Sequence, residues 1–317
     1  MFNWKRNLCF VWLAQFLSSG GFCFAFPFIP FYIEELGVKD PVMRNMWVGL
    51  FAAAGYFTLV LSSPIWGVLS DIYGRRVMIL RANFVSGLLM PLMAFVPGVG
   101  WLVFIRLLIG AFAGTVTASQ ILVSSNTPFR HRGFAMGSLG SAVYGGMMAG
   151  TFFGGIIVDQ LGYRTAFFIC GLTLIVAGFL VLFGVKEEFH KTSSLRAMIQ
   201  TFKFQFPHFG AVWFILLLIL LVGFATRFDT PFLPLLVEAV NGPDKAATWT
   251  GVIASLSAVA GAISGPLLGW VADRVSVPKV RMVRPVRRTV NDPARVGQHP
   301  AGADLLTARH GFFRGWA

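Results

Sequence analysis

The chain has few charged residues for its length. Asp, Glu, Lys and Arg make up 12% of its 317 residues, against roughly a quarter in a typical soluble domain. Hydrophobic residues make up 56%, which is more apolar surface than one water-soluble core of this size can bury. The shortage of charge therefore excludes an ordinary soluble domain and predicts that a lipid bilayer surrounds much of the chain.

Cysteine is scarce, and the sequence patterns of enzymes and metal sites are absent. Cys9 and Cys23 would lie about 21 Å apart along one helix, too far for a disulfide, and Cys170 lies in another apolar run. The sequence contains no phosphate-binding loop, no metal-ligand spacing among its five histidines and no nucleophile arrangement. We therefore expect no enzyme, metal or bound cofactor, and we interpret the cysteines as small core residues.

Eight apolar runs are long enough to cross about 30 Å of hydrocarbon as helices. They lie at roughly 8–33, 46–69, 77–96, 100–123, 133–157, 164–185, 210–236 and 249–270. The first run has no signal-peptide cleavage pattern, so we expect it to be retained. Barrel strands would alternate apolar and polar residues, which these runs do not. The predicted fold class is an all-α membrane protein, a helix bundle whose connections are short apart from a polar stretch at 186–208.

Lysine and arginine are distributed unequally between the two sides of the predicted bundle. If the N-terminus is cytoplasmic, the cytoplasmic segments hold Lys5, Arg6, Arg75, Arg76, Arg130, Arg132, Lys186, Lys191, Arg196 and Lys203. The opposite side then holds only Lys39, Arg44, Arg164 and Lys245. The positive-inside rule accordingly places the N-terminus in the cytoplasm.

An internal repeat relates the first and seventh runs. The stretch Pro27–Glu34 matches Pro231–Glu238 at an offset of 204 residues, and Pro64–Asp71 matches Pro266–Asp273 at an offset of 202. Two matches at nearly one offset indicate that the seventh run restarts the pattern of the first. Parallel six-helix repeats of this kind build one class of secondary transporter.

The most specific pattern is Gly67-Val-Leu-Ser-Asp71-Ile-Tyr-Gly74-Arg75-Arg76. It resembles the signature of the major facilitator superfamily between helices 2 and 3, although Ile72 stands where that family usually has arginine. We expect Gly67 to admit a close helix contact, Gly74 to permit a tight turn and the basic pair to face the anionic leaflet. Asp71 is placed to meet a helix N-terminus or a basic partner across the bundle.

The second half carries a partial copy of this motif at Gly269, Asp273 and Arg274. The resemblance implies that both copies belong to the conformational gate, and that Asp71 helps to latch the outward-facing state. The alternative is an ordinary solvated turn that obeys the positive-inside rule.

Two ionisable residues are candidates for proton coupling. Arg106 begins Arg106-Leu-Leu-Ile-Gly110 in the fourth run, and in proton-coupled members of the family the matching arginine is tied to proton transfer. An arginine in lipid should face a cavity or a partner, although it could also snorkel to the interface. Asp229 lies within the seventh run and is either a proton or cation site or a residue that reaches the outer interface.

The fifth run carries glycines at helical spacing. Gly146, Gly150 and Gly154 recur every four residues and form one smooth face for close packing. Together with Gly155 they resemble the helix 5 motif of drug:proton antiporters. Thr151 stands where that motif has proline, which leaves the kink, and with it the antiport assignment, open.

The last 38 or so residues do not continue the pattern. A ninth span at this point would hold Arg281, Arg284, Arg287 and Arg288, and its insertion would cost over about 10 kcal/mol. Residues 280–317 contain seven arginines and no lysine, a bias that suggests a shifted reading frame. The alternative is a genuine basic tail that binds anionic lipid or nucleic acid.

The predicted organisation is a six-helix half at 1–185, a cytoplasmic linker at 186–209, the start of a second half at 210–278 and a basic non-membrane tail at 279–317. We expect a major facilitator bundle with a complete first half and about two helices of the second half. Four missing helices would remove most of the second half's wall around the cavity, so we expect that this chain alone does not export.

The closer resemblance is to bacterial multidrug efflux members of the family. It rests on Asn3–Leu8, Pro27–Glu34 and Arg130–Gly137. It implies secondary active, proton-coupled export of small hydrophobic or cationic compounds across the bacterial inner membrane by alternating access, with the proton gradient as energy source and no cofactor. The lipid bilayer is the expected partner and nucleic acid is not, while the sequence leaves the oligomeric state open. The alternatives are a sugar or metabolite transporter of the same fold, or a non-transporting remnant or membrane scaffold.

Overall fold

A computed structural model describes residues 4–187, 210–227, 232–242 and 245–274. Contacts divide the chain into two units, Met1–Ser276 and Val277–Ala317, and all described residues lie in the first. Every regular element among them is a helix, which confirms the predicted fold class. Most of the predicted linker, the predicted basic tail and Asp229 lie outside the described residues.

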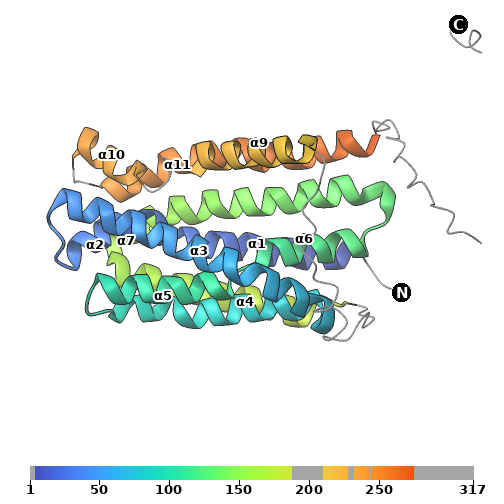
Figure 1. The fold of residues 1–317 in the computed structure, drawn as a ribbon, viewed down its shortest axis with the longest axis horizontal. Helices are drawn as coiled ribbons and strands as arrows, with labels where there is room; N and C mark the ends of the chain where they lie inside the picture. Colours follow the sequence, from blue (N-terminus) through green and yellow to red (C-terminus); the bar gives the residue numbers. More distant parts are fainter. Residues whose placement is uncertain (1–3, 188–209, 228–231, 243–244, 275–317) are drawn as a thin grey trace, which may run out of the picture. The chain divides into compact units, whose positions relative to one another are not determined.

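Figure 1 shows the helices running alongside one another. The longer elements are α1 (Trp4–Cys23), α3 (Pro41–Tyr73), α4 (Arg75–Leu89), α5 (Val99–Phe112), α6 (Thr115–Asn126), α7 (Arg132–Gly184), α9 (Gly210–Arg227) and α11 (Ala246–Arg274). Shorter ones are α2 (Ile29–Glu35), α10 (Leu233–Asn241) and the 3-10 turns η1 (Phe26–Phe28), η2 (Pro91–Phe95) and η3 (Phe129–His131).

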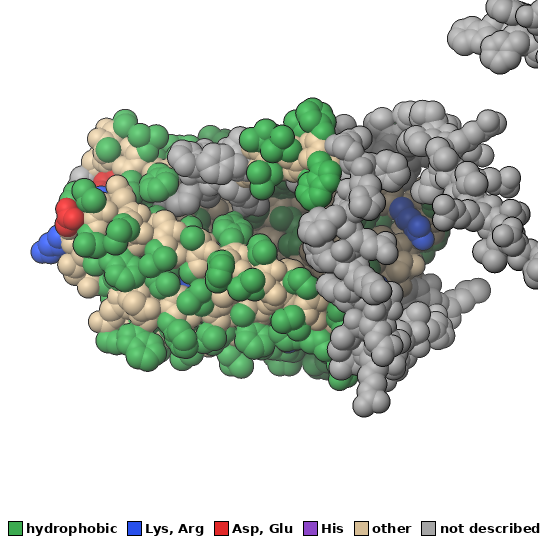
Figure 2. All heavy atoms as spheres, in the orientation of Figure 1, with side chains coloured by type: hydrophobic (Ala, Val, Ile, Leu, Met, Phe, Trp, Pro, Cys, Tyr) green, Lys and Arg blue, Asp and Glu red, His purple; other side chains and the backbone are tan. Residues whose placement is uncertain are grey.

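Five stretches of the described chain are long and apolar enough to cross a membrane. They are Trp4–Glu35, Pro41–Tyr73, Arg75–Phe95, Val99–Asn126 and Phe129–Gly184. Hydrophobic side chains are spread over much of the described face in Figure 2, and the acidic side chains in view lie at the end where α2 lies. An apolar surface of this extent indicates a multi-pass membrane protein.

The fifth stretch is 56 residues long because it contains two spans joined at a glycine. Gly162 has φ 80° and ψ 168°, a conformation that only glycine adopts readily. Before it, Gly146 and Gly154 of α7 contact Phe16 and Phe24, so this part runs parallel to α1. After Gly162 the order is reversed, because Leu174 contacts Gly21 and Gly184 contacts Phe10. α7 therefore supplies both the fifth and the sixth predicted span.

Two spans that were predicted to be continuous are interrupted, and a third, at 77–96, changes after Leu89 from α4 to the 3-10 turn η2. The first breaks after α1 and continues through η1 to α2, with prolines at the start of both short elements. The fourth breaks at Ala113 and Gly114, between α5 and α6, where Gly114 has φ 120°. Hydropathy could not reveal these breaks, since the residues around them remain apolar.

The internal repeat is also a repeat of local structure. Both α2 and α10 have a proline as their second residue, Pro30 in the first and Pro234 in the second. Both α3 and α11 carry an internal proline, Pro64 and Pro266 respectively. The matched sequences therefore form matched elements, as expected for two related halves.

The glycines of α7 pack against two different helices. Cβ atoms at Gly146, Gly150 and Gly154 would overlap backbone atoms of Phe16, Gly20 and Phe24, so this face lies directly against the first span. A Cβ at Gly155 would instead overlap the carbonyl of Ala247 in α11. The helix continues unbroken through Thr151, whose hydroxyl donates to the Met147 carbonyl at 2.7 Å.

The first prediction concerns this glycine face. Gly150→Ala should lower the free energy of unfolding by about 1–3 kcal/mol, because the new methyl group overlaps the Gly20 backbone. Gly140→Ala is the matched control on the same helix, since no atom of the described residues lies within 4 Å of its Cβ position. It should be neutral or stabilise the helix by up to about 1 kcal/mol. Thermal unfolding in detergent measures both, and equal losses of stability would contradict the packing described.

Candidate functional site

The turn of the Gly67–Arg76 motif depends on one glycine. α3 ends at Tyr73, Gly74 follows with φ 92°, and α4 starts at Arg75. The Gly74 amide donates to the Ser70 carbonyl at 3.0 Å and closes the last turn of α3. Gly67 was expected to admit a neighbouring helix, but nothing in the described structure lies within 4 Å of its Cβ position.

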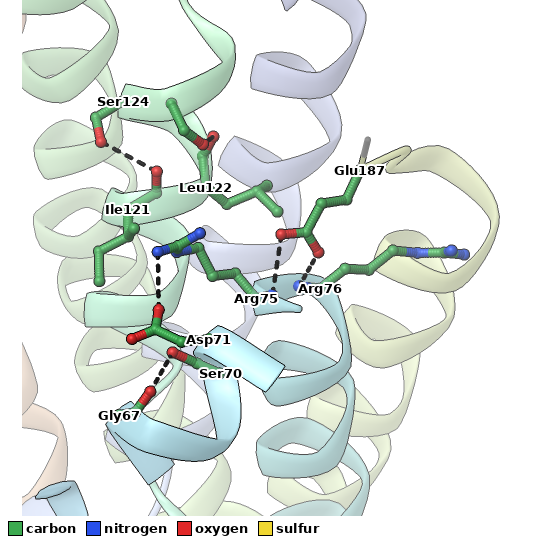
Figure 3. A network of polar contacts seen from close by, with 10 residues as sticks. Gly67, Ser70, Asp71, Arg75, Arg76, Ile121, Leu122, Ser124 and Glu187 are labelled. Atoms are coloured by element: carbon green, nitrogen blue, oxygen red, sulfur yellow. Dashed lines mark hydrogen bonds and ion pairs between the residues drawn. The ribbon is translucent and has the colours of Figure 1, made fainter. Parts of the chain in front are cut away.

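The charged residues of the motif bind one another and the end of α7. Arg75 donates to Asp71 at 3.1 Å. The ion pair that the structure describes for Asp71 is therefore with the first residue of α4 and not with a basic residue across the bundle. Arg76 donates to the Leu182 carbonyl, whereas it was predicted to face the lipid leaflet. Figure 3 shows the arrangement of Asp71 and Arg75 beside Glu187.

Glu187 caps the N-terminus of α4. Its carboxylate accepts from the backbone amides of Arg75 at 3.0 Å and Arg76 at 2.8 Å, as Figure 3 shows. A carboxylate at this place satisfies two free amides and interacts favourably with the helix dipole. Glu187 falls within the predicted linker, and the sequence gives no sign of this role because the contact joins residues more than a hundred positions apart.

The neighbouring Lys186 is fixed in the same region by Asn7. The Asn7 side chain donates to the Lys186 carbonyl at 2.6 Å and accepts from its amide at 3.1 Å. The end of α7 is thereby tied to the start of α1 through Lys186 and to the start of α4 through Glu187. Three helix ends therefore meet around the Asp71 motif.

Arg106 and Gly110 lie on one face of α5 and contact α3. A Cβ at Gly110 would overlap the Gly55 carbonyl and the Thr58 hydroxyl, and a Cβ at Gly55 would overlap the Arg106 guanidinium. The four-residue spacing of Arg106 and Gly110 therefore reflects one helix contact. The short side chain of Gly55 leaves the space that the guanidinium occupies.

The surroundings of the Arg106 guanidinium are aromatic. It lies 4.3 Å from the ring centre of Phe26 and 5.4 Å from that of Phe51. Rings at these distances attract a cation through their electron-rich faces. Its Nε has no hydrogen-bond partner among the described residues. Arg106 thus points into the bundle, beside the interruption between α1 and α2, and not toward the interface.

Arg81 was missed by the sequence analysis, although it is an arginine inside the third apolar run. Its guanidinium lies 3.4 Å from the centre of the Trp66 ring and donates to the carbonyls of Phe112 at 3.1 Å and Ala113 at 3.2 Å. The Trp66 indole donates to the Ala111 carbonyl at 2.6 Å. These bonds satisfy the carbonyls that the break between α5 and α6 leaves free, as a bilayer requires.

The remaining predicted site residues belong to the second half. α11 runs through Gly269, Asp273 and Arg274 as a helix, but the side chains of the two charged residues lie outside what the structure describes. The same holds for the whole of Asp229. Gly67–Asp71 and Gly269–Asp273 therefore both lie on helices, while the gating role of the second copy stays a prediction.

Comparison with known proteins identifies relatives over most of the chain. The profile of the Major Facilitator Superfamily matches residues 11–286. Multidrug resistance protein MdtG of Proteus mirabilis is 33% identical over 280 residues, which cover 88% of this chain and 70% of the relative. The protein of the same name from Escherichia coli is 34% identical over 284 residues, covering 88% and 69% respectively.

A solved structure has the same fold. The human organic anion transporter MFSD10 (TETRAN) aligns with a TM-score of 0.55 and 15% identity, covering 86% of this chain and 90% of that one. At this level of identity the similarity concerns the fold alone.

The second prediction concerns Arg81. Arg81→Leu should leave the Phe112 and Ala113 carbonyls unpaired and lower the free energy of unfolding by about 1–3 kcal/mol. Amide hydrogen exchange should accelerate in the peptide that spans residues 110–120, which contains the break. Arg130→Leu, at an exposed arginine, is the control and should leave exchange there unchanged. Equal exchange in the two variants would contradict the role assigned to Arg81.

Proposed function

Since the chain belongs to the Major Facilitator Superfamily of membrane transporters, we propose that it serves the export of small hydrophobic or cationic compounds. The observation that carries this proposal is the 33–34% identity to multidrug resistance proteins over 88% of the chain. Transport moves the compound without converting it, in keeping with the lack of an enzyme motif in the sequence. The bacterial inner membrane is the proposed location.

The proposed orientation places the N-terminus in the cytoplasm. The ten-to-four distribution of lysine and arginine supports it. The Asp71 motif and Glu187 then lie at the cytoplasmic end of the bundle. The connection between α2 and α3 lies at the outer end.

Arg106 and Asp229 are the proposed elements of proton coupling, with the proton gradient as the energy source. An arginine side chain stays protonated in proteins, so Arg106 would act through its fixed charge. A fixed positive charge inside the bundle weakens the binding of any cation nearby, so it favours release of the bound proton or of the cationic compound. Asp229 would carry the proton, since a carboxylate inside a span is the default proton site.

The third prediction tests the substrate class by direct binding. The purified protein in lipid nanodiscs should bind tetraphenylphosphonium, a hydrophobic cation, with saturation and with competition by ethidium. A sugar should not compete. Competition by sugars would favour a metabolite transporter of the same fold, and absence of any saturable binding would contradict the proposed function.

A separate assay addresses export by the 317-residue chain. The sequence prediction that this chain alone does not export implies no gain in drug resistance when it is expressed in cells that lack their own drug pumps; the chain spans about 70% of the length of the relatives it matches. Resistance that is lost in Arg106→Ala would overturn that expectation and establish export by the chain itself. Lys39→Ala, at an exposed residue of the α2–α3 connection, is the control for loss of a positive charge.

A further inference from the structure

One arginine contacts an acidic residue from each half of the molecule. Arg44 lies in the first turn of α3, forms an ion pair with Glu34 at the end of α2, and lies 3.8 Å from Glu238 in α10. Its side chain is only 15% exposed, and that of Glu238 is 26% exposed. The labels of Figure 1 place α2 and α10 at the end of the molecule where Figure 2 shows acidic side chains. Partial burial makes such a pair less screened than an ordinary surface ion pair.

The two acids are equivalent members of the internal repeat. Glu34 closes the sequence Pro27–Glu34 and Glu238 closes Pro231–Glu238, 204 residues later. Each lies in the second half of a short helix whose second residue is a proline. Arg44 therefore joins corresponding points of the two halves. If the halves move as units, a contact between such points must form or break.

A second contact joins the halves at the same end. Asp159 of α7 accepts from the amide of Thr248 at 2.8 Å and from its hydroxyl at 2.6 Å. Thr248 lies in the first turn of α11, so the carboxylate caps that helix. At the other end of α7 and α11, the structure describes close packing of the backbones at Gly137 and Gly265. Among the described side chains, no ion pair joins α11 to the first half there.

We propose that Arg44, Glu238, Asp159 and Thr248 form the outer gate of the transporter, and that the gate is closed in this structure. The proposal rests on the export function proposed above, with the two halves moving as units so that the binding site opens to one side of the membrane at a time. Opening toward the outside separates Glu238 from Arg44 and Thr248 from Asp159, while the Arg44–Glu34 pair stays within the first half. Glu34 therefore holds Arg44 in position when the gate is open.

The fourth prediction tests by cysteine labelling whether these contacts keep the outer end of the bundle closed. Cys9, Cys23 and Cys170 are replaced by alanine, and Val237→Cys supplies one reporter beside Glu238, at a position that is 7% exposed. The reaction with a membrane-impermeant maleimide is followed in nanodiscs, which expose both ends of the protein. Arg44→Ala and the nearly isosteric Glu238→Gln should each speed labelling by about two- to fivefold. The double variant should label little faster than either single variant, because both substitutions remove the same contact.

Two controls separate the gate from general loosening. Lys39→Ala removes an exposed charge from the same connection, and Glu34→Gln leaves the contact between the halves in place. Both should label at the parent rate. Labelling of Arg44→Ala and Glu238→Gln no faster than Lys39→Ala would overturn the proposal. The assay uses neither substrate nor gradient, so failure of the gate and failure of the export function are seen separately.

Discussion

Backbone contact at glycines is the constraint on which the rest of this structure depends. In lipid there is no hydrophobic force between helices, so association relies on close packing and on polar contacts. The first part of α7 meets that requirement on two faces: Gly150 lies against the first span, and Gly155 lies against α11. This helix therefore holds the core of the first half and also carries the contact with the second half. A larger side chain at either position would separate backbones that now touch.

Interrupted helices are the second feature that needs a physical account. A break in a span leaves carbonyl groups without partners, and a bilayer offers no water to bind them. Arg81 and Trp66 supply the missing donors at the break between α5 and α6. Arg106 lies beside the other interruption, against the ring of Phe26. The breaks place two arginines inside the bundle, and aromatic rings partly replace the water that each would otherwise bind.

The sequence predicted the features that local pattern determines. Apolar runs predicted the helical fold, the spacing of Gly146, Gly150 and Gly154 predicted a packing face, and Gly74 predicted the turn after α3. Long-range contacts could not be predicted, because no local pattern links Glu187 to Arg75 or Arg44 to Glu238. Arg81 carried a signal in its position within an apolar run, but its partners are carbonyls whose release depends on a break that hydropathy does not show.

The central claim is that α7 and α11 pack antiparallel, so that the second half begins against the fifth span. Disulfide cross-linking in a cysteine-free chain, with a protease site inserted at 188–209, tests it most directly. The pairs Asp159→Cys with Thr248→Cys and Gly137→Cys with Gly265→Cys should keep the two fragments together after cleavage under oxidising conditions. The crossed pair Asp159→Cys with Gly265→Cys should release them. Cross-linking of the crossed pair, or release with both matched pairs, would contradict the account.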